Sequence, residues 1–168
     1  MGIAILACAL VAGGGVAHAE VIDRVLAIVG GQLIMLSDVH AAQDLRLVTP
    51  APSPDPIREV LSRLIDRELQ LTDVERYAPP EPTADEVDRA VQTVRDRFPS
   101  PGAFEAVLAR SGIDLDRLRE RLREDLRIQA YLDQRFAMSG DRRQKLIDDW
   151  MARLRRSVTV IDLYLVGS

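Results

Sequence analysis

Few side chains in this sequence have the types and spacing that catalysis or metal binding requires. The chain holds one cysteine, Cys8, and two histidines, His18 and His40. A thiolate–imidazole pair or a zinc site needs several such groups close together. No G-x-S-x-G stretch accompanies His40, so we interpret it as a histidine on a helix surface rather than as a pH sensor or a general base. The sequence therefore predicts no catalytic residue, no metal site and no cofactor.

Carboxylates and glycines give no stronger indication of chemistry. Asp148 and Asp149 are neighbours, but their surroundings are typical of a solvated helix face rather than of an acid–base pair. The glycine-rich stretches are Gly13–Gly15, in an apolar leader, and Gly30–Gly31, between two predicted strands, so neither predicts a phosphate-binding loop. The formal net charge is −4, from 22 basic and 26 acidic residues. A nucleic-acid binder is expected to carry a basic excess, and this chain has none.

The first residues predict export from the cytoplasm. Residues 1–19 are apolar and end in Ala17-His18-Ala19, the small-residue pattern of a signal peptide cleaved after Ala19. No Lys or Arg precedes the apolar run, so either the α-amino group serves alone or the start is placed too far downstream. The alternatives are a membrane anchor, a buried helix and a lipoprotein modified at Cys8, which the poor lipobox Ile5-Leu6-Ala7 and the missing basic residue disfavour. The run is short for a membrane span, and its glycines disfavour a helix. We expect a periplasmic protein without a stable membrane anchor once the signal is removed.

The mature chain, residues 20–168, is predicted to be one domain, mainly helical with a small sheet. Val21–Val29 and Gln32–Leu36 are rich in Val, Ile and Leu and flank Gly30–Gly31, which suits a tight hairpin turn. Ser37 is predicted to cap a helix from Asp38 to about Val48. The predicted ribbon is apolar on both faces, so it needs a further partner.

Helices are predicted over most of the rest of the chain, and each begins at a recognisable cap. Asp55-Pro56 begins a helix that Pro79 and Pro80 end, and Thr83 to Glu86 forms a capping box. Further helices are expected over Pro101–Arg110, from the cap Asp114 to about Phe136, and from the cap Asp141 onward.

The last predicted element is a strand from Val158 to Val166. An unpaired apolar strand would be prone to aggregation. Because the only other predicted strands lie near the start of the chain, we expect it to complete the hairpin as a third strand. The domain then divides into residues 20–136, the ribbon and helices, and residues 141–168, the C-terminal helix and strand.

This order of elements resembles the SurA-type periplasmic chaperones along essentially the whole mature chain. The segments that carry the resemblance are VIDRVLAIVGG and LSDV in the ribbon, IREVLSRLIDRELQL, FEAVLARSGIDLDRLRERLREDLRIQAYLDQRF, and WMARLRRSVTVIDLYL at the end. Such chaperones usually carry parvulin-type prolyl isomerase domains before the last helix. Here only Ala137–Gly140 intervene, and His40 alone cannot form the histidine pair of a parvulin site. The resemblance therefore implies a SurA-type chaperone core (the SurA N-terminal domain family) without the isomerase.

The resemblance implies binding of unfolded outer-membrane polypeptides without nucleotide. A holdase of this kind would use a groove between helices with adaptable apolar side chains. The candidate peptide-binding residues are Phe104, Tyr131, Phe136, Met138, Met151 and Tyr164. For each of them the alternative is a core position, because aromatic and Met residues at helical spacing usually pack inside.

Two other classes of function remain open. The chain could be related to a prolyl isomerase, as a remnant or an accessory subunit, and a proline isomerisation assay would show this. It could instead be a dimeric structural or assembly factor of the cell envelope, joined through swapped terminal strands or the Leu115–Leu126 seam. Light scattering with and without an unfolded client separates this class from a holdase.

Overall fold

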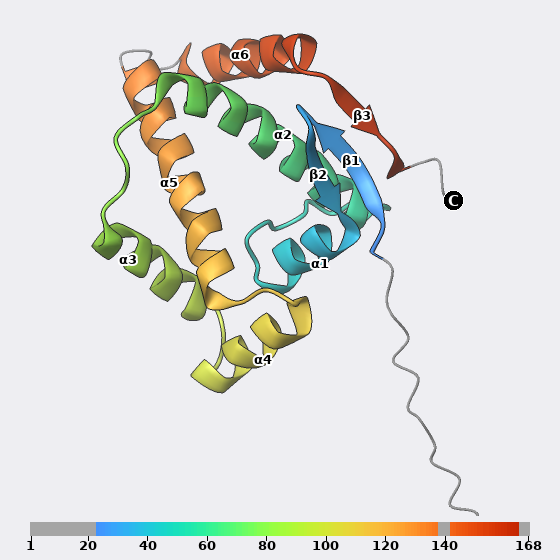
Figure 1. The fold of residues 1–168 in the computed structure, drawn as a ribbon, viewed down its shortest axis with the longest axis vertical. Coiled ribbons are helices and arrows are strands. Elements are labelled where there is room, and N and C mark those ends of the chain that lie inside the picture. The colour runs from blue at the N-terminus through green and yellow to red at the C-terminus, as the bar shows by residue number, and fades with distance from the viewer. Residues whose placement is uncertain (1–22, 138–141, 165–168) are drawn as a thin grey trace, which may run out of the picture.

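A computed structural model describes residues 23–137 and 142–164 of the chain (Figure 1). The predicted signal peptide with Ala17 and Ala19, the predicted cap Asp141 and the candidate Met138 lie outside these residues. In chain order the elements are β1 (Val25–Val29), β2 (Gln32–Met35), α1 (Leu36–Asp44), α2 (Pro56–Tyr77), α3 (Ala84–Arg95), α4 (Pro101–Ser111), α5 (Leu115–Phe136), α6 (Arg143–Ser157) and β3 (Val160–Asp162). The prediction of a mainly helical fold with a small sheet is confirmed.

The sheet joins the two ends of the described chain. Its strand order is β2-β1-β3, and both pairs are antiparallel. Gly30 and Gly31 form the hairpin turn with φ values of 56° and 95°, a backbone region that glycine enters without steric cost. Ile28 of β1 pairs with Ile161 of β3, so the predicted closure of the hairpin by the C-terminal strand is confirmed. The closing strand is shorter than predicted and ends at Asp162.

The start of α1 differs from the prediction. The helix begins at Leu36 rather than after a Ser37 cap. The Ser37 hydroxyl donates to the Asp23 carboxylate instead, while Asp38 accepts a 2.8 Å hydrogen bond from the Met35 N–H. The contact with Asp23 joins residues fourteen positions apart, so local spacing does not predict it. The helix also ends at Asp44, earlier than predicted.

The other predicted caps within the described residues are confirmed. Asp55 accepts from the Arg58 N–H at the start of α2, and Asp114 accepts from the Arg117 N–H at the start of α5. Thr83 and Glu86 exchange the reciprocal bonds of a capping box. These side chains satisfy N–H groups that have no partner inside the helix, and they fix where the helices begin.

Two hydrophobic clusters hold the molecule together, and α5 belongs to both. The first joins the sheet, α1, α2 and α6 with the C-terminal half of α5, which contributes Ile128, Tyr131 and Phe136. The second joins the end of α1, α3 and α4 with the N-terminal half of α5, which contributes Leu118 and Leu122. Figure 1 shows α5 running from the α3 and α4 end of the molecule to α6. This helix therefore fixes the position of one cluster relative to the other.

Candidate functional site

Most of the predicted peptide-binding side chains lie inside the protein. Phe104, Tyr131, Phe136 and Met151 expose 1%, 5%, 6% and 8% of their surface. Tyr164 is half-buried beside the first cluster. A client could not touch the four buried side chains without rearrangement of the core. Their role in peptide binding stays a prediction, and their burial is what the alternative, a core position, predicts.

One of these candidates, Tyr131, and the neighbouring Trp150 contact a buried carboxylate, that of Asp73 in α2. Its Oδ2 atom accepts a 2.8 Å hydrogen bond from Trp150 Nε1 and a 3.0 Å bond from the Tyr131 hydroxyl. Arg135 donates to the same Tyr131 oxygen at 2.6 Å. Burial, and then the hydrogen bond to Asp73, raise the pKa of Tyr131 to about 12, so this hydroxyl remains protonated at neutral pH. The network connects α2, α5 and α6.

Sequence reasoning missed Asp73, although a signal was present. Leu61, Ile65 and Leu69 recur every four residues along the buried face of α2, and the next position of this series is Asp73. A charged residue at a core position of a helix indicates a buried hydrogen-bonding partner, because an unpaired buried charge is costly.

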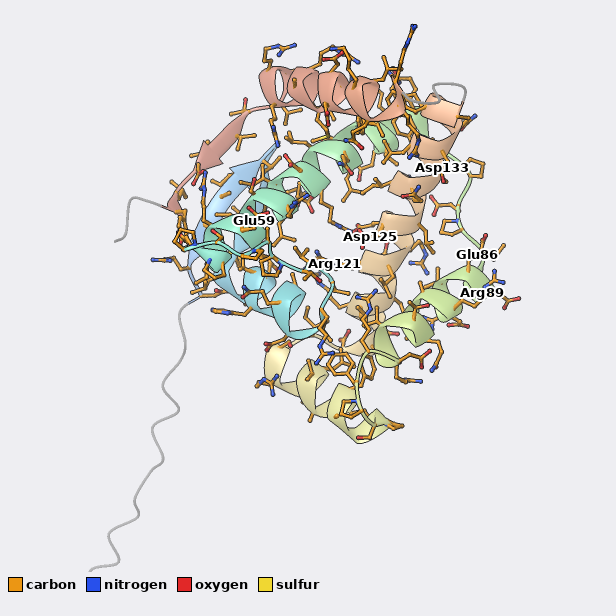
Figure 2. All side chains as sticks on the ribbon, turned by 180° about the vertical axis from the view of Figure 1, so that it is seen from behind. Glu59, Glu86, Arg89, Arg121, Asp125 and Asp133 are labelled. Carbon is orange, nitrogen blue, oxygen red and sulfur yellow. The ribbon has the colours of Figure 1, made fainter. Side chains whose placement is uncertain are left out.

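A cavity of about 400 Å³ lies between α3 and α5, and we call it the α3–α5 groove. Its floor is apolar and its rim is polar. The residues that line it are Ala90, Val94, Leu122 and Leu126, with Glu86, Arg89, Thr93 and Arg97. Figure 2 shows Glu86 and Arg89 on α3 at this side of the molecule. A groove with an apolar floor and a charged rim can bind an apolar side chain.

A second cavity, of about 350 Å³, lies between β2, α2 and α5, and we call it the central cavity. Its walls are mixed. The apolar members are Leu33, Ile34, Leu64, Leu71, Ile113 and Leu118, the acidic members are Asp38, Glu68, Glu75, Glu120 and Glu124, and the basic members are Arg67, Arg117 and Arg121. The segments that supply them are far apart in the sequence, so spacing alone did not predict this site.

Arg67 is the best-paired charge in the central cavity. It donates to Asp125 at 2.6 Å, to Glu124 at 2.7 Å and to Glu68 at 2.9 Å, and its side chain is 13% exposed. Burial by itself would lower the pKa of Arg67, but the carboxylates of Asp125 and Glu124 raise it above its ordinary value. Burial also raises the pKa of Glu68. The ion pairs of Arg67 with Glu124 and Asp125 connect α2 to α5.

Arg121, unlike Arg67, is poorly paired. It lines the central cavity, and its Nε atom is buried without a hydrogen-bond partner among the described residues. Burial, and then the positive charge of Arg67, lower the pKa of Arg121 from its ordinary value. Figure 2 shows Arg121 and Asp125 near the middle of the molecule, on α5. A guanidinium held in this way has donor capacity that the protein does not use.

We also searched the described residues for a reactive histidine, a metal site and a membrane-spanning helix. His40 is exposed on α1, as predicted. Within residues 23–137 and 142–164, no cluster of three or more His, Cys, Asp or Glu side chains is arranged to bind a metal ion. Nor is any helix in these ranges both long and apolar enough to cross a bilayer.

Comparison with known proteins relates the chain to a chaperone at low sequence identity. No protein-family model matches the sequence. The chain is 33% identical, over 140 residues, to the protein named chaperone SurA of Pseudomonas putida. The matched region is 79% of this chain and 33% of that protein, so the chain spans about a third of the length of its relative. This similarity suggests that the chain is related to the SurA family of chaperones.

Proposed function

We propose that the chain is a periplasmic chaperone that holds unfolded outer-membrane polypeptides without nucleotide. The observation that carries the proposal is the similarity to chaperone SurA over 79% of the chain. The leader at residues 1–19 supports export, because an apolar run that ends in Ala17-His18-Ala19 has the form of a signal peptide. A holdase acts by binding the unfolded state in preference to the folded state, which needs no energy source.

The α3–α5 groove is the surface that we assign to apolar client side chains. Ala90 and Leu126 lie in it and are only partly buried, so a client can reach them without rearrangement of the core. The small size of the groove favours weak binding, because the hydrophobic contribution to affinity scales with the apolar area removed from water. Weak binding allows a client to leave for a stable folded state by mass action.

Aggregation of an unfolded client tests the proposal. An outer-membrane β-barrel protein is diluted from urea into buffer without nucleotide, and its light scattering is followed with and without the chain. We expect near-stoichiometric amounts of the chain to suppress most of the scattering. Scattering that is the same with and without the chain would contradict the proposal, and proline isomerisation by the purified chain would favour an enzyme instead.

A matched pair of variants tests the assignment of the groove. Leu126→Asp places a charge in the groove, and Leu146→Asp places the same charge on α6, where Leu146 is 40% exposed. We expect Leu126→Asp to weaken suppression several-fold and Leu146→Asp to leave it close to that of the parent. Equal activity of the two variants would show that clients bind elsewhere.

A further inference from the structure

The edge of β2 that faces away from β1 has an unused hydrogen-bonding pair. Val29 and Gln32 flank the two-glycine turn and Ala27 pairs with Ile34, so these positions direct their backbone groups across the hairpin. Leu33 lies between Gln32 and Ile34 and therefore directs its N–H and C=O outward. The described residues supply no hydrogen-bond partner for either group. The next outward N–H, that of Met35, is already bonded to Asp38.

This edge borders the central cavity, although Leu33 itself is 56% exposed. Leu33 and Ile34 line the cavity together with Arg121 and the apolar side chains of Leu64 and Leu118. The place therefore combines three features: one free backbone donor and acceptor at Leu33, a guanidinium whose Nε atom has no partner among the described residues, and apolar side chains within mixed walls. An extended peptide offers a match to each, because it carries N–H and C=O groups along one edge and side chains on alternate faces.

We propose that an extended segment of an unfolded polypeptide binds at the central cavity as a fourth strand beside β2, with its backbone bonded to Leu33 and a carbonyl oxygen accepting from Arg121. The inference rests on the proposed chaperone function and names how the client backbone is held. Main-chain hydrogen bonds supply affinity that does not depend on sequence, which suits clients of many sequences.

The charges of the cavity favour this occupant over a free anion. Five of its lining side chains are acidic and three are basic, and Arg67 is fully engaged by carboxylates. A phosphate or sulfate ion would meet this negative excess, whereas a peptide carbonyl is a neutral acceptor that can still take a hydrogen bond from Arg121.

The opposite edge of the sheet is protected against the same kind of pairing. Asp162 is one of the outward-facing positions of β3, and its carboxylate is paired with Arg58 and accepts from the Tyr164 N–H. A short edge strand with a fixed charge discourages strand addition. Leu33, in contrast, is 56% exposed and carries no such protection.

Two substitutions at one position separate the backbone role of Leu33 from its side chain. Leu33→Pro removes the outward N–H, and proline is tolerated on an edge strand where the N–H faces away from the ladder. Leu33→Ala removes most of the side chain but keeps the N–H. Binding of a short fluorescein-labelled peptide of alternating threonine and valine is measured by fluorescence anisotropy. We expect Leu33→Pro to bind about tenfold more weakly than the parent, and Leu33→Ala to bind within about twofold of it.

Arg121→Met and amide exchange complete the test. Methionine keeps the volume of the buried stem and removes the donors, so we expect a folded protein with a several-fold weaker affinity for the peptide. Hydrogen exchange at the Leu33 amide is expected to slow when the peptide saturates the parent. If Leu33→Pro does not fold, as judged by circular dichroism, these two measurements decide.

The outcomes distinguish the two proposals. A parent that binds the peptide, with both variants unweakened and the Leu33 amide unprotected, would overturn strand addition and leave the chaperone function standing. A parent that neither binds the peptide nor suppresses client aggregation would overturn both.

Discussion

The Asp73 side chain and the Nε atom of the partly buried Arg121 are both shielded from water, but only Asp73 has hydrogen-bond partners among the described residues. Asp73 is 8% exposed and accepts from Tyr131 and Trp150, so the cost of burying its charge is offset by hydrogen bonds. Arg121 keeps a buried Nε without a partner. A satisfied buried group stabilises the fold, whereas an unsatisfied one is a candidate for ligand binding.

We expect Asp73→Ala to lower the free energy of unfolding by about 2–4 kcal/mol, because the substitution leaves the Tyr131 hydroxyl and the Trp150 N–H without their buried acceptor. Urea denaturation followed by circular dichroism measures the change. The near-ultraviolet signal of Trp150 is expected to change as well, since its indole then loses its fixed partner.

Asp66→Ala is the matched control on the same helix. Asp66 pairs with Arg155 of α6 near the surface, and Arg155 is 54% exposed. A pair of this kind contributes about 0–1 kcal/mol, so we expect a much smaller loss than for Asp73→Ala. Equal losses for the two variants would contradict the central place of the Asp73 network.

Within helices and strands, contacts between residues close in the sequence were predicted correctly, whereas most contacts between distant residues were not. The caps Asp55, Thr83 and Asp114 follow from side chains within three residues of the groups that they satisfy. Ser37 was predicted wrongly as a cap because its hydroxyl has a distant partner, Asp23. The closing strand was predicted because an apolar strand needs a partner, although its length was overestimated.

The candidate sites also depend on contacts between distant residues, so local sequence patterns did not predict them. The central cavity combines side chains of β2, α2 and α5, which only the tertiary structure brings together. Periodicity identified Phe104 and Tyr131 as apolar-face residues, but it cannot distinguish a groove from a core. The spacing of α2 indicates that Asp73 is buried, but the partners of Asp73 and the lack of a partner for the Arg121 Nε atom depend on packing between helices, which a single helix does not encode.

The capping box of α3 fixes where this helix begins, and α3 forms one wall of the α3–α5 groove. We expect Thr83→Ala to lower stability by about 1 kcal/mol, because the Glu86 N–H loses its acceptor. Thermal unfolding measures the change. Thr93→Ala on the same helix is the control: Thr93 is exposed and does not cap, so a loss as large as that of Thr83→Ala would argue against the capping role.

For the whole molecule, the connection between the two ends of its described part is the central feature. Besides the β1–β3 ladder, the Tyr164 hydroxyl donates to both carboxylate oxygens of Asp55, at 2.7 and 2.8 Å. The Arg58 N–H and then the Tyr164 hydroxyl hold the pKa of Asp55 below its ordinary value, so the carboxylate that caps α2 also holds the C-terminal segment. The end of the described chain is thus fixed to the second helix as well as to the first strand.

Deletion of residues 158–168 tests this connection. The truncated chain loses the β3 pairing and exposes the edge of β1, so we expect lower thermal stability and self-association. Size-exclusion chromatography with light scattering compares its mass with that of the parent. A truncated chain with the mass and unfolding midpoint of the parent would show that the third strand is dispensable.

The antiparallel pairing of β1 and β3 determines how the molecule responds to mechanical force. The beginning of β1 and the end of β3 lie at the same end of the pair, where the Leu163 N–H bonds to the Leu26 carbonyl. Tension applied at both termini would therefore break the inter-strand hydrogen bonds one after another. In a shear geometry, by contrast, all of these bonds would bear the load together. Because the first bonds to break are those beside the termini, the sheet would peel apart under low tension before the helices extend.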